Sequence, residues 1–278
     1  MIDIKRKKAF AIVTILVTIA IIYWCYKFYA DGIYSSNYNA AGLSMYYTIN
    51  SFGNFLPFYI FLGFLATNFL ATNYYKNKYS KFDNFVITRV KRKKRIKYEI
   101  KSILIWSFIF RVLLHILVLI IINYFFVELH FSFYKDPSYY PNGFFTFSNS
   151  SLGSLIIFII YSSIGFSIFS LFIYSLISYI KNYYVYKISG IIMAIIGVLL
   201  PAFIGNIYLS HYSNYSFLVT AFMYSIYSGG LLCPGLEILN QLPSTLILHI
   251  YFFVSCIGYT ILSVILILIR YREEKKYG

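Results

Sequence analysis

Long uninterrupted stretches of apolar residues are the main feature of this sequence. A helix that crosses a bilayer needs about 20 apolar residues, and six such runs occur here, over residues 10–29, 52–74, 103–127, 152–180, 188–209 and 246–269. None shows the alternation of a barrel strand, and backbone groups in lipid must be bonded within their own segment. The pattern therefore predicts an all-α polytopic membrane protein, a single transmembrane domain over residues 1–278 with six transmembrane helices.

A seventh apolar run, residues 217–233, differs from the other six. Serines and the Gly229-Gly230 pair interrupt it, and Pro234 follows directly. Reading it as a span would also move the basic C-terminal tail to the opposite side of the membrane. We therefore predict a re-entrant or interfacial element in an external loop over residues 210–245, before the sixth helix. Irregular backbone at that depth has to be buried in protein or line a cavity.

The composition excludes a soluble domain. Hydrophobic residues make up 60% of the chain and charged residues only 12%, whereas about a quarter of the residues of a soluble domain are charged. The formal net charge is nevertheless +15, a value that would indicate nucleic-acid binding if it were spread over a soluble surface. The position of the basic residues decides between these two interpretations.

Most of the basic residues fall on one side of the predicted membrane. Of the 24, 21 lie in the N-terminal tail, the loop 75–102, the link 181–187 and the tail from Arg270. With their acidic residues these segments carry +16, whereas the external side, which includes loops 30–51 and 128–151, carries −2. Positive charge stays on the cytoplasmic side. Both termini are therefore predicted to be cytoplasmic in a multi-pass protein of the bacterial plasma membrane, with no nucleic-acid partner.

Few residues inside the predicted spans could perform chemistry. Arg111 and His115 lie four residues apart on the third helix and share one face, which we expect to point into the bundle. Two interpretations stay open: a structural polar contact, or a position on a translocation path. Cys25, Cys233 and Cys256 lack metal-ligand spacing, and no nucleophile, zinc-protease or nucleotide-binding motif occurs. We therefore expect no catalytic site, metal or directly bound cofactor.

The loop between the second and third helices, residues 75–102, contains eleven basic residues. Ser80 with Asp83 resembles the start of a capped helix, after which apolar residues recur at helical spacing among lysines and arginines. The pattern predicts a short amphipathic helix in the membrane interface. Positive charge here also orients the chain and attracts anionic membrane lipids. Because orientation alone does not require such a helix, we expect it to dock a cytoplasmic partner.

These features together resemble the permease subunits of ABC-2-type transporters. The shared architecture is six helices with both ends inside, an amphipathic segment after the second helix and an interrupted element before the last. The local motif consists of Ile87-Thr88-Arg89, Arg92, Lys93 and Lys101. In that family the amphipathic segment is a coupling helix that docks on a separate ABC ATPase subunit.

The resemblance implies a complex of two ATPase and two permease subunits, in which the second permease is a copy of this chain or a paralogue. ATP and Mg²⁺ would then be bound by the ATPase and not by this chain. The docking residues implied by the resemblance are Asp83, Asn84, Phe85, Thr88, Arg89 and Arg92.

The expected substrate follows from the scarcity of polar residues in the spans. Beyond Arg111 and His115 the helices encode no charged cavity, which argues against sugars, metals and amino acids. The aromatic external loop 128–151 suits a hydrophobic or amphipathic molecule that leaves the membrane. We therefore expect export of, or immunity to, a membrane-active peptide such as a bacteriocin. Export of a lipid or hydrophobic drug, and a non-transporting sensor or assembly partner, are the alternatives.

Overall fold

The computed structural model describes residues 15–16, 18–27, 29, 38–72, 74–75, 92–140, 147–211, 217–236 and 245–276. Within these ranges the regular structure is helical, without a strand. Four helices are long and apolar enough to cross a membrane, namely α6 (Arg92–Phe125), α7 (Ser151–Ser175), α8 (Tyr183–His211) and α11 (Thr245–Lys276). They indicate a multi-pass membrane protein, as the apolar runs predict.

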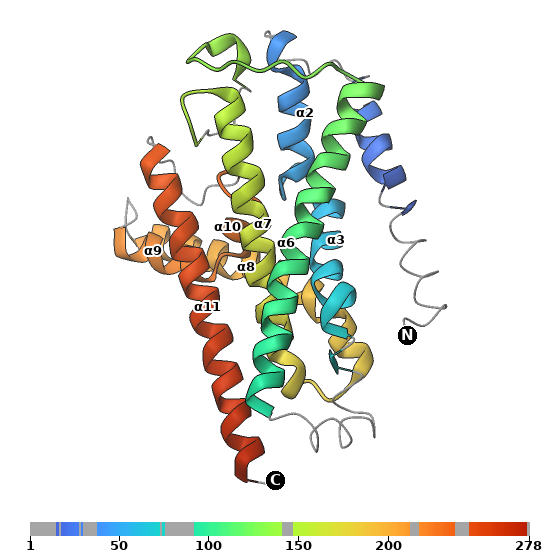
Figure 1. Cartoon of the computed structure of the whole chain (residues 1–278). Coiled ribbons are helices and arrows are strands. Elements are labelled where there is room, and N and C mark those ends of the chain that lie inside the picture. Colours follow the sequence, from blue (N-terminus) through green and yellow to red (C-terminus); the bar gives the residue numbers. More distant parts are fainter. Residues whose placement is uncertain are drawn as a thin grey trace.

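Helices α6, α7 and α11 form the long axis of the molecule (Figure 1), with α7 packed against both of the others. The start of α6, the turn between α7 and α8 and the end of α11 lie at the same end of the bundle. Lys94, Lys181 and Arg272 belong to these segments, and we refer to them as the basic end. The connection that follows α6 lies at the opposite end.

Helix α6 is longer than the predicted third span, which begins at residue 103. The additional residues are the basic run that starts at Arg92. Lysine and arginine are good helix formers, and Arg95 Nε donates to Glu99 Oε1 at 2.8 Å, an i,i+4 pair that supports the helix. The apolar run therefore begins only after these charged residues, whereas the helix already begins at Arg92.

The connection from α6 to α7 is held by local hydrogen bonds. The N–H of Ser132 donates to Ser151 Oγ at 2.8 Å. Asp136 precedes the short 3-10 helix η3 (Pro137–Tyr139), and its Oδ1 accepts the N–H of Ser138 at 3.0 Å and the Ser138 hydroxyl at 2.7 Å. Because both donors stabilise the ionised carboxylate, they lower the pKa of Asp136.

Within the predicted span 52–74, residues 56–72 are helical without interruption, but the type of helix changes along them. Helix α3 (Leu56–Ala66) follows a turn and continues into a π-helical segment, η2 (Thr67–Ala71). In that segment the Asn68 side chain donates to the carbonyl of Lys187 in α8 at 3.1 Å. Side chains that bond to backbone groups compete with the regular helical ladder. The predicted span is therefore helical from Leu56 onward, with a π-helical segment that hydrophobicity alone does not predict.

Residues 30–51, predicted to be an external loop, contain a helix. A 3-10 turn, η1 (Tyr38–Ala40), leads into α2 (Ala41–Asn50), all of whose residues are buried and which packs against α6. Its ten residues are about half the length of a membrane span, so the helix escaped a search for long apolar runs. Polar residues fit inside because they bond within the helix, as Thr48 Oγ1 does to the Ser44 carbonyl at 2.8 Å.

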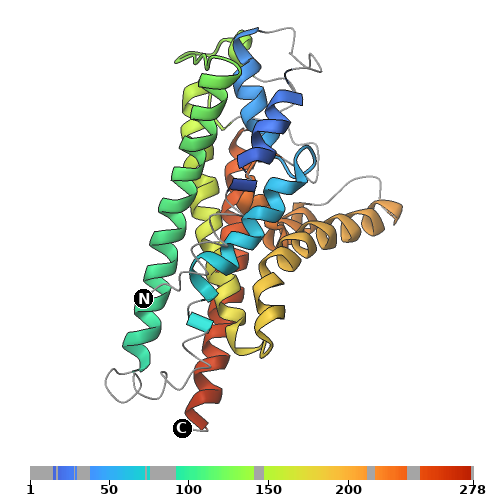
Figure 2. The same ribbon diagram turned by 90° about the vertical axis from the view of Figure 1, so that its right-hand side faces the viewer.

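Helix α8 bends partway along its length. Its first half packs along α3, whereas its second half turns away from the long axis together with α9 (Phe217–Ile226), as Figure 2 shows. Pro201 lies inside α8, where it removes one helical hydrogen bond and causes a kink. The predicted span 188–209 is thus helical, but it is longer at both ends and not straight.

The predicted re-entrant segment forms two short helices, α9 and α10 (Ser228–Leu232), and no long helix. All of α10 is buried and packs against α7, α8 and α11. Glycines permit the close approach of the backbones, because a Cβ at Gly165 of α7 would lie 2.0 Å from the Leu231 carbonyl oxygen. A Cβ at Gly258 of α11 would lie 2.1 Å from the Ser225 carbonyl oxygen. The irregular backbone is therefore enclosed by protein.

Candidate functional site

The two ionisable residues noted on the third predicted helix both lie inside the bundle. Arg111 is 0% and His115 1% exposed. Leu113, between them on α6, points to the surface and is 58% exposed. The buried face of α6 therefore carries a cation and an imidazole into a region surrounded by α2, α3, α7 and α10.

Arg111 contacts three other elements. Its Nη2 donates to Asn50 Oδ1 at the end of α2 at 3.0 Å and to the Leu232 carbonyl of α10 at 3.4 Å. The guanidinium carbon lies 5.3 Å from the ring centroid of Phe58 in α3, a cation–π contact. Asn50 Nδ2 donates to the Tyr46 carbonyl at 2.9 Å, which orients its amide oxygen toward the arginine. One side chain of α6 thus links α2, α3 and α10.

Part of the Arg111 guanidinium has no hydrogen-bond partner. Nε and Nη1 are buried and unbonded, and no carboxylate of the described residues forms an ion pair with this side chain. A buried donor without a partner costs about 1–3 kcal/mol, and more if it is charged. A buried positive charge with free donors is an arrangement that attracts an anion.

Both ring nitrogens of His115 are hydrogen-bonded. Nδ1 lies 2.7 Å from the Tyr46 hydroxyl of α2, and Nε2 lies 2.6 Å from Ser162 Oγ of α7. Because the Ser162 hydroxyl also donates to the Ile159 carbonyl at 3.3 Å, we assign Nε2–H as donor to Ser162 and Nδ1 as acceptor from Tyr46. The Phe158 ring packs edge-on against His115, with centroids 5.6 Å apart. The imidazole therefore bridges α2 and α7.

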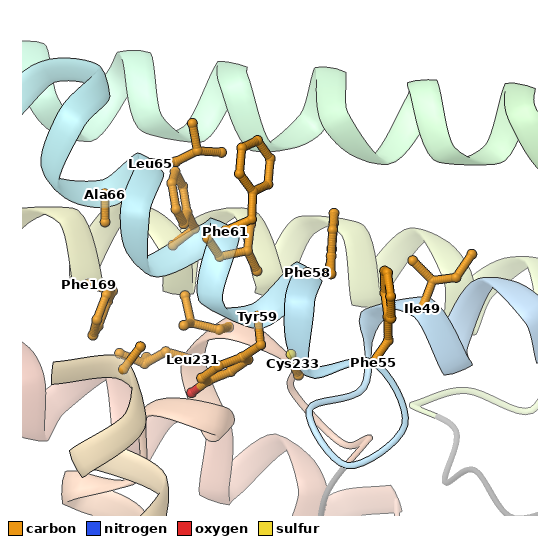
Figure 3. Packing of buried hydrophobic residues seen from close by; sticks show 14 of the residues in the cluster. Ile49, Phe55, Phe58, Tyr59, Phe61, Leu65, Ala66, Phe169, Leu231 and Cys233 are labelled. Carbon is orange, nitrogen blue, oxygen red and sulfur yellow. The ribbon is translucent and has the colours of Figure 1, made fainter. Parts of the chain in front are cut away.

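Helix α10 is also held from the opposite side. Tyr59 points from α3 toward α10 (Figure 3), and its hydroxyl lies 2.7 Å from Ser228 Oγ. Ser228 Oγ donates to the Ala194 carbonyl of α8 at 2.8 Å, so that Tyr59 is the donor to Ser228. The Tyr259 hydroxyl of α11 donates to the Ile226 carbonyl at 3.0 Å, just before α10. Hydrogen bonds from α3, α6, α8 and α11 thus fix this segment.

A second buried polar cluster lies nearer the basic end and joins α6, α7 and α11. Glu99 of α6 is 5% exposed. Its Oε1 accepts from Arg95, and its Oε2 accepts from the Tyr174 hydroxyl of α7 at 2.5 Å. Arg270 Nη1 of α11 donates to the same hydroxyl at 3.4 Å. This cluster differs from the Arg111 site because a carboxylate balances its positive charge.

Of the six residues predicted to dock an ATPase, the structure describes the backbone of one, Arg92. Five of them lie outside the described residues, namely Asp83, Asn84, Phe85, Thr88 and Arg89. Arg92 is the first residue of α6, at the basic end. Most of the predicted amphipathic segment, residues 76–91, also lies outside the described residues, so its docking role stays a prediction.

The described residues contain no group of three or more His, Cys, Asp or Glu side chains that could hold a metal ion. Cys25 and Cys233 are buried and Cys256 is partly buried, each as a free thiol. The chemistry of the site is therefore that of Arg111 and His115 and their polar neighbours: donation of hydrogen bonds and electrostatic attraction of an anion.

Sequence reasoning missed the partners of these two residues. Tyr46 and Asn50 come from a segment predicted as a loop, and Ser162 from a span read only for its hydrophobicity. Spacing was the available signal. Tyr46 and Asn50 lie four residues apart, as do Arg111 and His115, so that two helices can pair these positions face to face.

Comparisons of the chain with models of known protein families, with curated proteins and with solved structures find no match. The resemblance to ABC-2 permeases therefore stays a prediction from sequence. The contacts of Arg111, His115 and α10 are the structural observations on which a functional proposal can be built.

Proposed function

We propose that this chain is the permease subunit of an ATP-driven exporter of the ABC-2 type. The observation that carries this proposal is α10, a short helix enclosed in the bundle and bonded to the buried Arg111. Broken helices at membrane depth occur where they are buried in protein or line a pathway, and transporters use them to hold substrates and ions. A bundle that only anchors the chain in a membrane needs no such element.

In this proposal the protein has six membrane helices with both termini in the cytoplasm. Helices α6, α7, α8 and α11 provide four of them. The apolar residues 10–29 provide the first helix and α3 with η2 provides the second. Helices α9 and α10 form the re-entrant element. The basic end of the bundle faces the cytoplasm, because positive charge is retained there.

A separate pair of ABC ATPase subunits supplies the energy, since the chain encodes no nucleotide-binding motif. The coupling segment around Asp83 and Arg89 docks on the ATPase and leads into α6 at Arg92. A second permease subunit, a copy or a paralogue, completes the complex. ATP binding has to favour one of two bundle arrangements, because a ligand with equal affinity for both shifts neither.

The proposed substrate is a hydrophobic or amphipathic molecule, in the first place a membrane-active peptide of the bacteriocin type. The surroundings of Arg111 support this class, since the single cation is flanked by Phe58 and lies close to the aromatic residues around His115. Sugars and free amino acids require more polar partners than these. At the end opposite the basic end, Phe133 and Tyr134 expose their rings, a surface suited to a hydrophobic molecule.

The test is purification of the full chain together with any ABC ATPase encoded beside its gene, followed by measurement of ATP hydrolysis by the complex in lipid nanodiscs. We expect the charge reversals Asp83→Lys and Arg89→Glu, together, to lower ATPase co-purification by about tenfold or more, because close charge pairs dominate such docking. Arg272→Gln, which removes an exposed charge from α11 at the basic end and outside the predicted coupling segment, is the matched control and should co-purify normally.

Two results would speak against the proposal. If the double reversal leaves both co-purification and ATP hydrolysis at the level of Arg272→Gln, the coupling segment does not dock the ATPase. If a folded, membrane-inserted chain co-purifies with no ATPase at all, the sensor or assembly-partner alternative replaces the transporter.

A further inference from the structure

We infer that Arg111 binds the carboxylate group of the transported molecule, in a site formed by α2, α3, α6 and α10. The inference rests on the proposed function and assigns a chemical end-group to its substrate. Two kinds of membrane-soluble molecule offer such a group: a hydrophobic peptide with a free C-terminus, and a fatty acid. The shared chemistry is a single negative charge on two oxygen atoms at the end of an apolar chain.

The positive charge of Arg111 has no negative partner among the described residues. Arg111 is fully buried, and no described carboxylate forms an ion pair with it. Among the described residues the other buried arginine is Arg270, which shares a cluster with the carboxylate of Glu99 through Tyr174. Buried charges are ordinarily paired in this way. Arg111 is bonded instead to a neutral amide and a backbone carbonyl, which leaves one positive charge to be balanced.

The Arg111 guanidinium also has N–H donors without an acceptor. Guanidinium groups carry five N–H donors, and Nη2 of Arg111 is engaged by Asn50 and the Leu232 carbonyl. Nε and Nη1 are buried without any partner. Each of these nitrogens shares one edge of the guanidinium with Nη2, so that a carboxylate accepting from Nη2 and from Nε or Nη1 would use both of its oxygens. The site therefore has both the charge and the hydrogen-bond donors for an oxyanion.

The charge of the site favours an oxyanion with a single negative charge. One arginine balances one negative charge, and His115 adds none, because in the assignment above Nε2 carries the only ring proton and Nδ1 accepts from Tyr46. A phosphate monoester with two charges would leave an uncompensated charge in apolar surroundings, which is strongly unfavourable. A carboxylate has the matching charge, and the contact that it would replace is the weaker of the two hydrogen bonds that Arg111 Nη2 makes.

That contact is the one between Arg111 Nη2 and the Leu232 carbonyl. At 3.4 Å it is longer than the 3.0 Å bond to Asn50 and therefore weaker. A carboxylate oxygen is a stronger acceptor than a carbonyl and would replace it. Substrate binding is then coupled to release of α10 from α6, since Arg111 donates to either the substrate or α10.

The binding experiment uses the full chain in nanodiscs of zwitterionic lipid, with empty nanodiscs subtracted for partitioning. The probes are N-acetylated pentaleucine with a free C-terminus, the same peptide as its C-terminal amide, dodecanoate and dodecanol. We expect the wild-type protein to bind at least one acid about tenfold or more tightly than its neutral counterpart, the range for a charge-assisted hydrogen bond.

Two variants test whether Arg111 is responsible. Arg111→Gln should abolish the preference for the acid. Asn50→Asp places a carboxylate where an amide oxygen now lies 3.0 Å from Nη2, so that the protein itself balances the charge. This variant is nearly isosteric and adds a partner, so it should fold at least as stably as the wild type and yet lose the preference. Lys101→Gln should retain it.

The four probes distinguish a peptide substrate from a fatty acid and from the absence of a carboxylate site. Preference for the peptide acid identifies a peptide substrate, and preference for dodecanoate alone identifies a fatty acid; both support a carboxylate site. Equal binding of acid and neutral probes by the wild type, or a full preference retained by Asn50→Asp, would overturn the inference. Failure here leaves ATPase docking untouched, whereas carboxylate binding by a chain without an ATPase partner would preserve this site and remove only the transporter.

Discussion

Tyrosine hydroxyl groups connect the buried polar residues of this bundle. The Tyr46 hydroxyl bonds to His115 at 2.7 Å, and that of Tyr174 bonds to Glu99 at 2.5 Å. An aromatic ring fills space between apolar helices while its hydroxyl satisfies a polar group that lipid could not. Part of the high tyrosine content of the chain, 31 residues, therefore serves the interior.

Replacing Tyr174 by phenylalanine is expected to lower the free energy of unfolding by about 1–3 kcal/mol, the cost of leaving a buried acceptor unpaired. The change keeps the ring but removes the donor to Glu99 Oε2 and the oxygen that Arg270 Nη1 contacts. Reversible unfolding by SDS in mixed micelles, followed by helical circular dichroism, measures the loss.

The matched control for this substitution is Tyr184→Phe. Tyr184 is 76% exposed, and a surface change of this kind alters stability by no more than about 0.5 kcal/mol. Equal stability of the Tyr174→Phe and Tyr184→Phe proteins would show that the cluster around Glu99 contributes nothing.

At the level of single residues, only part of the candidate site could be predicted from the sequence. Arg111 and His115 could be picked out because ionisable residues are rare in membrane helices. Asn50, Tyr46 and Ser162 carry no such mark, because amides and hydroxyls are common both inside helices and in loops. Their roles depend on which helices meet, and this is a property of the packed chain and not of any local pattern.

Between elements, glycines determine how closely helices approach. A Cβ at Gly63 of α3 would lie 2.7 Å from the Gly190 carbonyl of α8, and one at Gly165 of α7 would lie 2.0 Å from the Leu231 carbonyl. Helices in membranes associate largely through such small residues, which bring their backbones into contact. The position of α10 thus depends on the absence of a side chain at Gly165.

Substituting Gly165 by alanine is expected to destabilise the protein by about 1–3 kcal/mol or more, because the added methyl group meets backbone that cannot rotate away. Displacement of α10 should also weaken its contact with Arg111. Unfolding in SDS measures the first effect, and faster hydrogen exchange of the α10 amides measures the second.

Ile160→Ala on the same helix provides the comparison for this prediction. Ile160 is 42% exposed, so its truncation removes little packing within the chain. Gly165→Ala would have to differ from it both in stability and in exchange at α10. If the two proteins behave alike, α7 and α10 do not depend on the close approach at Gly165.

The secondary structure was predictable where one physical signal dominates. Long apolar runs identify α6, α7, α8 and α11 because lipid requires them. Helix α2 and the π-helical segment after α3 were not predicted. Their structure depends on burial by neighbouring helices and on hydrogen bonds from side chains to the backbone. The bend in α8 could be anticipated at Pro201, although its direction is decided by what it packs against.

For the whole molecule, the distribution of charge agrees with the way the elements are stacked. The start of α6, the turn between α7 and α8 and the end of α11 lie together at one end, and they are among the most basic segments of the chain. The acidic residues Glu128 and Asp136 lie in the connection at the other end. Charge could therefore be sorted by side from sequence alone, once the spans were known.

This arrangement predicts opposite accessibility for two engineered cysteines. Tyr134→Cys, at an 83% exposed position, should react with a membrane-impermeant maleimide in intact cells. Lys181→Cys, exposed in the turn between α7 and α8, should react only after the membrane is permeabilised. The wild-type chain, with its three native cysteines, gives the background, and the reverse pattern of labelling would invert the proposed orientation.

Helix α6 contains neither glycine nor proline from Arg92 to Phe125. The 19 residue-to-residue steps from Arg92 to Arg111 correspond to roughly 28 Å of unbroken helix at a rise of 1.5 Å per residue. Such a rod transmits tilt and rotation with little loss, in contrast to the kinked α8. Whatever moves the basic end of α6 therefore moves Arg111 as well. Helix α6 acts as a lever arm between the most basic segment of the chain and the one buried charge that has no counter-charge among the described residues.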